Sequence, residues 1–254
     1  MSQEKNYSAK DVLNIATTVG FNLLRYGAEV YRVEETITRI CRAYGYDDSH
    51  VFAIGSNITA SVMDGEITQT ETRRIKSRDL NLDKIDKLNH LSREVCSEMP
   101  PLSEVRKKIA EIKNGPVYPL WVMVICDAII SGCFTLFFGG DIYEAIIAFF
   151  AGAIARASWA LTSKFSNVHQ YYKIMVSSFI VAFIAHVFQN NFIIISADLI
   201  IIGSIMTLVP GISVTNSLRD FFAGDTVTGL ITFAESILVA VSIAIGVAIA
   251  MVLT

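Results

Sequence analysis

The chain has 254 residues, 52% of them hydrophobic and 18% charged, and a formal net charge of −3. The charge is uneven: residues 1–115 hold 17 Lys and Arg and 17 Asp and Glu, whereas residues 116–254 hold only 4 and 7. A soluble core with so few charges is unusual, so we expect residues 116–254 to lie in a membrane and residues 1–115 to form a soluble domain. The balanced charge excludes a nucleic-acid binder, which needs a cationic face.

The soluble part begins with a pattern typical of two helices. Apolar residues recur every three or four positions over residues 9–26 and again over residues 29–44. Gly27 lies between them, and glycine readily takes the left-handed conformation that ends many helices. The other face of the second helix is charged and includes the i,i+4 pair Glu35 and Arg39. A solvated face is the ordinary interpretation of these charges, and a regulatory surface is the alternative.

The period of the pattern then changes. Three short segments rich in Val, Ile and Thr follow at residues 51–54, 58–62 and 67–75. Asp64 and Gly65 separate the last two segments and are typical of a β-hairpin turn. We therefore predict a three-stranded meander.

Two more helices are predicted near residues 82–97 and 102–113, on either side of Pro100 and Pro101. Proline does not continue a helix interior, so the break belongs there. Residues 1–115 are thus predicted to form an α+β domain.

No motif in this domain indicates catalysis. It lacks a phosphate-binding glycine loop, a zinc-protease motif and a nucleophile elbow. The four cysteines of the chain form no CxxC pair, which favours free thiols over disulfides or a zinc site. We therefore expect no enzyme, no metal and no cofactor.

The second half contains five apolar stretches, each near the ~20 residues that a helix needs to cross the hydrocarbon core. They lie at residues 117–138, 142–161, 172–188, 192–209 and 230–253. The sequence therefore predicts an α-helical membrane domain of about five transmembrane helices over residues 116–254.

The basic residues between these stretches predict an orientation. Lys and Arg precede the first stretch at 106–113, follow the second at Lys164 and Lys173, and follow the fourth at Arg219. The loops at 139–141 and 189–191 have none. By the positive-inside rule, the soluble domain lies in the cytoplasm and the C-terminus outside the cytoplasmic (inner) membrane.

Asp127 lies midway along the first apolar stretch, where a charge costs at least ~2.5–3.5 kcal/mol on insertion scales. A role in a polar pathway or proton relay is one interpretation. A carboxyl that is protonated, or hydrogen-bonded to a neighbouring helix, is the other. Asp198, Glu235 and His186 lie nearer to the ends of their stretches, where contact with interfacial water is the ordinary interpretation.

Residues 208–225 form the second candidate site. A Pro-Gly pair ends a hydrophobic helix here, and a segment rich in hydroxyl groups follows with one Arg-Asp pair. Broken helices of this kind bind anionic groups in many transporters, and an Arg can hold a carboxylate. The alternative is a plain cytoplasmic loop in which the Arg only determines topology. The candidate substrate-binding residues are Pro210, Gly211, Ser213, Thr215, Asn216, Arg219 and Asp220.

At this point the chain resembles the threonine/serine exporter family. The resembling segments extend over almost the whole chain in the expected order, at residues 24–36, 56–60, 78–81, 138–140 and 209–229.

The resemblance implies a secondary exporter with a cytoplasmic N-terminal domain and a bundle of about five helices. One-chain members carry a second membrane block, so this chain resembles the split form, whose subunit works with a small separate membrane protein. The implied substrate is a small carboxylate-bearing molecule, threonine or serine, exported with the proton gradient. Asp127 is the candidate for proton coupling, and a homo-oligomer is also possible.

Two other functions stay open. Export of succinate or another dicarboxylate is associated with a split pair of the family, although the net charge of −3 in the membrane half argues mildly against it. A membrane-anchored sensor or scaffold is the alternative of a different class. A pure anchor has no need of a costly intramembrane charge.

Overall fold

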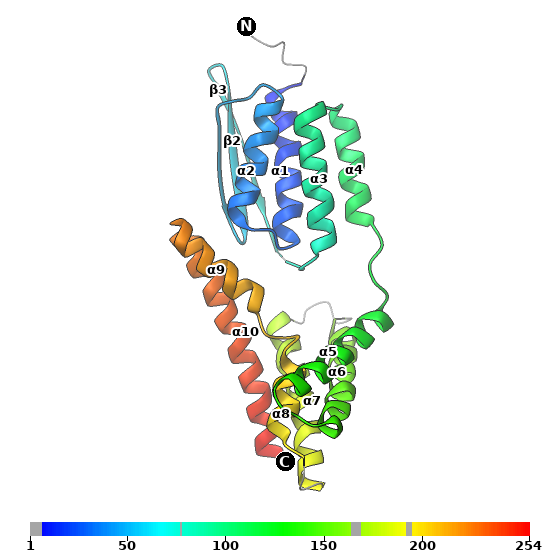
Figure 1. Cartoon of the computed structure of the whole chain (residues 1–254). Helices are drawn as coiled ribbons and strands as arrows, with labels where there is room; N and C mark the ends of the chain where they lie inside the picture. Colours follow the sequence, from blue (N-terminus) through cyan, green and yellow to red (C-terminus); the bar gives the residue numbers. More distant parts are fainter. Residues whose placement is uncertain (1–6, 77, 164–168, 192–194) are drawn as a thin grey trace. The chain divides into compact units, whose positions relative to one another are not determined.

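The computed structural model describes residues 7–76, 78–163, 169–191 and 195–254, and Figure 1 draws the whole chain. Its internal contacts divide the chain into two compact units. One is Met1–Pro116 together with Gly224–Thr228, and the other is Val117–Ala223 together with Gly229–Thr254. Each contains a hydrophobic core of its own.

The N-terminal unit confirms the predicted order of helices and strands, and its three strands form an antiparallel sheet in the order β1-β2-β3. Its elements are α1 (Ala9–Arg25), α2 (Val30–Ala43), β1 (Ser49–Ile54), β2 (Asn57–Asp64), β3 (Ile67–Arg74), α3 (Leu82–Glu98) and α4 (Leu102–Asn114).

Local signals in the sequence explain where these elements begin and end. The Ser8 side chain accepts a hydrogen bond from the Asp11 N–H and so caps α1. Gly27 has a φ of +92°, which lets the chain turn between α1 and α2. Asp64 pairs with Ile67 across the tight turn of the β2–β3 hairpin. These turns bring α1 and α2 against the sheet.

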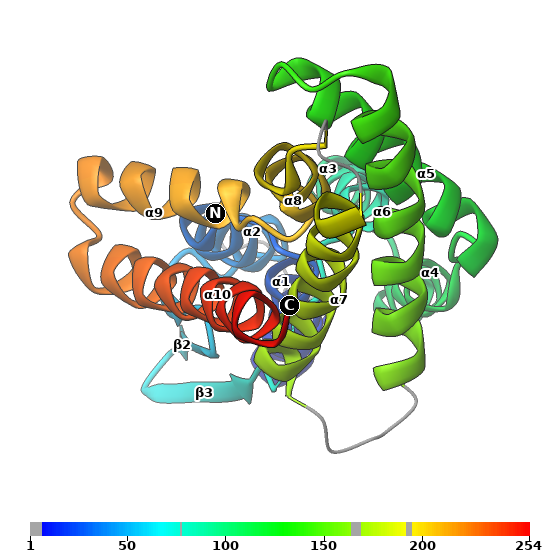
Figure 2. The ribbon, with the colours of Figure 1, turned by 90° about the horizontal axis from the view of Figure 1, so that it is seen from below.

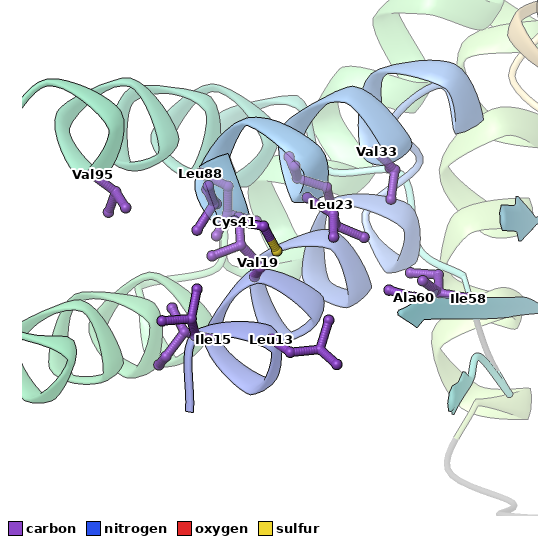
Figure 3. Close-up of a cluster of buried hydrophobic side chains, with 14 of the residues drawn as sticks. Leu13, Ile15, Val19, Leu23, Val33, Cys41, Ile58, Ala60, Leu88 and Val95 are labelled. Atoms are coloured by element: carbon purple, nitrogen blue, oxygen red, sulfur yellow. The ribbon is translucent and has the colours of Figure 1, made fainter. Parts of the chain in front are cut away.

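The core of this unit lies between the helices and one face of the sheet. Figure 3 shows apolar side chains of α1, α2, α3 and β2 pointing toward one another. Val19, Ile37, Ile58 and Leu88 are completely buried, one from each of these elements. Burial of a side chain of this size contributes about 1.5–3 kcal/mol, so these positions hold the unit together.

The regular elements of the second unit are all helices in the part of the chain that the structure describes. Its elements are α5 (Leu120–Phe137), α6 (Ile142–Thr162), α7 (Gln170–Asn191), α8 (Ala197–Ile205), α9 (Gly211–Ala223) and α10 (Thr226–Leu253). Among the described residues, α5, α6, α7 and α10 are long and apolar enough to cross a membrane. They correspond to four of the five predicted stretches.

The fourth predicted stretch, residues 192–209, is not a membrane-length helix in the structure. Residues 192–194 lie outside the described residues, and α8 has only 9 residues. At 1.5 Å per residue such a helix covers roughly 14 Å, about half of a ~30 Å hydrocarbon core. Hydropathy alone does not reveal where an apolar helix ends, which explains the difference.

Two predicted loops also differ from the structure. Residues 189–191 form the last turn of α7, and the segment after Pro210 is the helix α9. The segment after Pro210 is therefore a helix rather than irregular chain, and the role of Arg219 stays a prediction. Lys164, used to predict orientation, lies outside the described residues.

Small residues set the distances between the helices of this unit. A Cβ on Gly132 of α5 would lie 3.1 Å from the Ala145 carbonyl oxygen of α6, and a Cβ on Gly203 of α8 would lie 2.6 Å from the Thr135 backbone nitrogen of α5. Helices in lipid approach this closely where side chains are small. The helices α9 and α10 run side by side in both views (Figures 1 and 2).

Candidate functional site

An ion pair joins two of the apolar helices. Arg156 Nε of α6 lies 3.6 Å from Asp127 Oδ2 of α5, and the side chains are 29% and 22% exposed. Both groups come from helices that qualify as membrane spans. Charges at such positions are paired because an isolated charge in hydrocarbon is costly. This pair is the central feature of the candidate site.

Further contacts fix both members of the pair. The Ser131 hydroxyl donates to the Asp127 carbonyl oxygen at 2.8 Å, one turn along α5. Arg156 Nη2 lies 2.8 Å from Met123 Sδ, a weak acceptor. Met is a poor partner for a guanidinium, so the Arg156 head retains donors for a stronger acceptor such as a carboxylate.

Hydroxyl groups continue from Arg156 along the contact between α6 and α7. Ser158 Oγ and Ser177 Oγ lie 3.2 Å apart, and Ser177 Oγ lies 3.4 Å from the Ala155 carbonyl oxygen. Ser177 and its neighbour Ser178 are buried. The α6–α7 contact is therefore polar at these serines.

Glu144 is a buried acid of this unit. Its Oε2 accepts the Asp141 N–H at 2.9 Å and completes a capping box, and its Oε1 accepts the Ser196 N–H at 2.7 Å. Ser196 is the residue before α8. Glu144 therefore ties the start of α6 to the start of α8, which is a structural role.

The predicted 210–220 site residues lie on α9, except Pro210, which precedes it. Gly211, Ser213, Thr215 and Arg219 are exposed, Pro210 and Asn216 are partly buried, and Asp220 is buried. The Thr215 hydroxyl donates to the Gly211 carbonyl oxygen at 3.0 Å. These residues therefore occupy several faces of one helix.

The neighbouring helix α10 presents hydroxyl groups over its first half. Thr228, Thr232 and Ser236 are buried and recur every four residues, on one face. A Cβ on Gly229 would lie 3.0 Å from the Ser217 carbonyl oxygen of α9, so the two helices are in close contact. Thr228 Oγ1 has no hydrogen-bond partner among the described residues.

The two predicted parts of the site thus have different neighbours. Asp127 is paired with α6, whereas Ser217 of α9 lies against α10. The sequence interpretation did not identify Arg156 or Glu144, although the sequence contains a signal for each of them. Arg156 is an arginine within an apolar stretch, and Asp141 with Glu144 three residues later is the pattern of a capping box.

Among the described residues, no group of three His, Cys, Asp or Glu side chains is arranged to hold a metal ion. The chemistry that this unit offers is therefore that of an ion pair and hydroxyl groups within apolar helices. It suits binding of a polar solute.

Comparison with known proteins gives a family match. The family model described as "Putative threonine/serine exporter" (ThrE) matches residues 14–254. The chain is 30% identical over 237 residues to the "Probable succinate transporter subunit YjjP" of Klebsiella aerogenes, covering 90% of this chain and 88% of that protein. It is 27% identical to the protein of the same name from Escherichia coli, covering 94% and 93%.

A longer relative matches over part of its length. The "Threonine/serine exporter" of Corynebacterium glutamicum is 25% identical, and the match covers 93% of this chain but only 50% of that protein. No solved structure matches the chain.

Proposed function

The chain belongs to the threonine/serine exporter family, and on that premise we propose that it is a membrane subunit of a secondary exporter of small carboxylate-bearing metabolites, driven by the proton gradient. The ion pair between Asp127 and Arg156 supports this proposal most directly. The Arg156 guanidinium supplies a cation for a substrate carboxylate, and the Asp127 carboxylate can accept a proton. Both groups lie within apolar helices.

The pair suggests how export and proton entry are coupled. In the cytoplasm-facing protein Asp127 is ionised, a substrate carboxylate binds the Arg156 guanidinium, and the ammonium group of an amino-acid substrate binds the Asp127 carboxylate. In the outward-facing protein Asp127 takes a proton, which removes the partner of the ammonium group, and the substrate leaves. Asp127 then carries the proton inward and releases it to the cytoplasm before the next substrate binds. Each cycle therefore moves one substrate out and one proton in.

The residues of α9 are proposed as a second substrate contact. Pro210 directly precedes the helix α9, and this helix carries the other six residues, which are Gly211, Ser213, Thr215, Asn216, Arg219 and Asp220. The hydroxyl face of α10 at Thr228 and Thr232 supports a polar path beside it.

The proposal includes a partner and an orientation. Two relatives that match over nearly their full length are named as transporter subunits, which supports a partner subunit for this chain. We propose that this partner is a small membrane protein. Residues 1–115 are proposed to be the cytoplasmic domain, and residues 116–254 the membrane domain in the cytoplasmic membrane.

Threonine and serine are the first substrates to test, and a dicarboxylate is the second candidate. The relatives named for succinate match over 88% and 93% of their length, whereas the named threonine/serine exporter matches over 50%. This difference in coverage supports succinate as the second candidate.

The test is efflux of labelled serine, threonine and succinate from proteoliposomes under an imposed proton gradient. The chain is reconstituted alone and with a candidate membrane partner subunit. We expect gradient-dependent efflux of one of the three when both proteins are present. Absence of efflux for all three in folded protein would contradict the proposal and favour a sensor or scaffold.

Variants test the ion pair in the same assay. Asp127→Asn is expected to abolish the dependence on the proton gradient while leaving exchange of substrate across the membrane. Arg156→Gln is expected to abolish both. Arg156→Lys keeps the positive charge but loses the fork of donors, and we expect partial activity. Unchanged efflux in Asp127→Asn and Arg156→Gln would exclude the pair as the coupling site.

A further inference from the structure

A cavity of ≈ 250 Å³ lies on the N-terminal unit between α2 and α3. Pockets for drug-sized ligands measure about 300–1,000 Å³, and one water occupies roughly 30 Å³ of the liquid. The cavity is therefore of a size for a small metabolite. It is lined by Glu35, Thr36, Arg39, Ser92, Arg93, Cys96 and Ser97.

The two arginines of the cavity can receive an anion. Among the residues that the structure describes, Arg93 has neither an ion pair nor a hydrogen bond from its side chain. Arg39 is paired with Glu35, but both side chains are more than half exposed. An exposed pair contributes only ~0.2–1 kcal/mol, so Arg39 can exchange Glu35 for a ligand carboxylate at little cost.

The hydroxyl groups of the cavity act as hydrogen-bond acceptors, in contrast to the guanidinium donors. Ser92 Oγ donates to the Asn89 carbonyl oxygen at 2.8 Å, and Ser97 Oγ donates to the Glu94 carbonyl oxygen at 3.1 Å. Their protons are used within α3, so they present lone pairs to the cavity. Together with the Glu35 carboxylate they form a set of acceptors, suited to a cation with several N–H donors.

The cavity therefore combines guanidinium donors with a carboxylate and hydroxyl acceptors in a space of metabolite size. A dicarboxylate or an inorganic phosphate satisfies the donors but leaves Glu35 opposite a second negative group. An α-amino acid satisfies both sets, because its carboxylate meets the arginines and its ammonium group meets the acceptors. We propose that the α2–α3 cavity is a binding site for a small zwitterionic amino acid.

This site belongs to the N-terminal unit, whereas the proposed transport site uses α5, α6 and α9. It is consequently independent of the export mechanism. Its ligand can be present in a chain that does not transport, and the two proposals fail separately.

The test measures binding to the full chain in detergent by titration calorimetry, with L-threonine, succinate and inorganic phosphate as probes, in an Arg156→Gln background that removes the proposed transport site. We expect L-threonine to bind and the two anions to bind at least tenfold more weakly. No binding of L-threonine, or equal binding of succinate or phosphate, overturns the proposal.

Variants locate the ligand. Arg93→Gln should weaken L-threonine binding by about tenfold to a hundredfold, the usual effect of losing a hydrogen bond to a charged group. Arg42→Gln is the matched control, because Arg42 is an exposed arginine of α2 that pairs with Asp47 and does not line the cavity. Equal binding by wild type and Arg93→Gln overturns the proposal.

Cys96 gives a readout that does not depend on a variant. Its half-buried thiol lines the cavity, and burial raises its pKa, which the nearby Arg39 partly opposes. Bound L-threonine should slow alkylation of Cys96 by N-ethylmaleimide, measured by peptide mass spectrometry, and should leave alkylation of Cys133 in α5 unchanged. Equal rates for Cys96 with and without L-threonine contradict the site.

Discussion

Gly152 of α6 lies directly against Ser131 of α5. A Cβ on Gly152 would overlap the Ser131 hydroxyl and would lie 2.9 Å from the Asp127 carbonyl oxygen. Arg156 is four residues further along α6, on the same face, where it meets the Asp127 carboxylate. The close crossing at Gly152 thus determines whether the ion pair forms.

Gly152→Ala is expected to separate α5 from α6 and to lower stability by about 1–3 kcal/mol, the usual cost of overpacking. The measurement is thermal unfolding of the purified protein in detergent. Gly211→Ala is the control for stability, because nothing lies within 4 Å of a Cβ at Gly211. Equal unfolding temperatures for Gly152→Ala and wild type would show that α5 and α6 accommodate the added methyl group without loss of stability.

The ion pair makes a prediction about coupling between its members. Asp127→Asn and Arg156→Gln each leave one charge without its partner, so each should destabilise the protein. The double variant should lose less than the sum of the two, with an interaction free energy of about 0.5–3 kcal/mol. Chemical unfolding of the four proteins gives this value. An additive result would mean that the two charges do not interact.

Glu144 uses both of its carboxylate oxygens on different backbone donors, Asp141 N–H and Ser196 N–H. Gln offers only one acceptor oxygen, so Glu144→Gln should leave one donor unsatisfied, at a cost of about 1–3 kcal/mol. Glu144→Ala should cost more. Thermal unfolding measures both effects, and a Gln variant as stable as wild type would refute the role as a tie between α6 and α8.

Glu34 predicts a pH dependence of stability. Burial raises its pKa above the ordinary 4.5, and the hydrogen bond from the Ala53 N–H partly opposes this. The folded state therefore holds the proton over a range of pH in which the unfolded chain has lost it. The contribution of Glu34 to the unfolding free energy is highest below pH 4.5 and falls as the pH rises through the pKa of the folded state.

Glu34→Gln should consequently show a flatter profile of stability against pH from about pH 4 to pH 7 than wild type. Urea unfolding across this range is the measurement. Glu34→Ala is the control, since it lacks the acceptor as well as the proton. It should show the same flat profile at lower stability. Parallel profiles for Glu34→Gln and wild type would contradict the raised pKa.

Much of the N-terminal unit could be predicted from the sequence because its signals are local. Alternating apolar residues, Asp64-Gly65 and Pro101 place the strands and helices within a few residues of their observed ends. The length of α8 could not be predicted in this way. The Ser196 N–H donates a hydrogen bond to the carboxylate of Glu144, 52 residues earlier, and a hydropathy profile does not reveal such a bond.

The candidate site shows the same division. Asp127 can be recognised as a candidate from the sequence alone, because a charge in an apolar stretch is costly in any fold. Its pairing with Arg156 depends on how α5 crosses α6 at Gly152, which is a contact between helices. The roles of Asp127 and of the 210–220 segment remain predictions for the efflux assay.

The hydrogen bond between Glu34 and Ala53 has a consequence for solubility. The strand β1 is an edge of the sheet, and an open edge invites the strand of another molecule. Glu34 Oε1 accepts the Ala53 N–H at 2.7 Å, so a carboxylate from α2 occupies a donor that an incoming strand would need. At the opposite edge, β3 carries Glu71, Arg73 and Arg74. Both borders of the sheet thus discourage its extension, which protects the N-terminal unit from aggregation between copies.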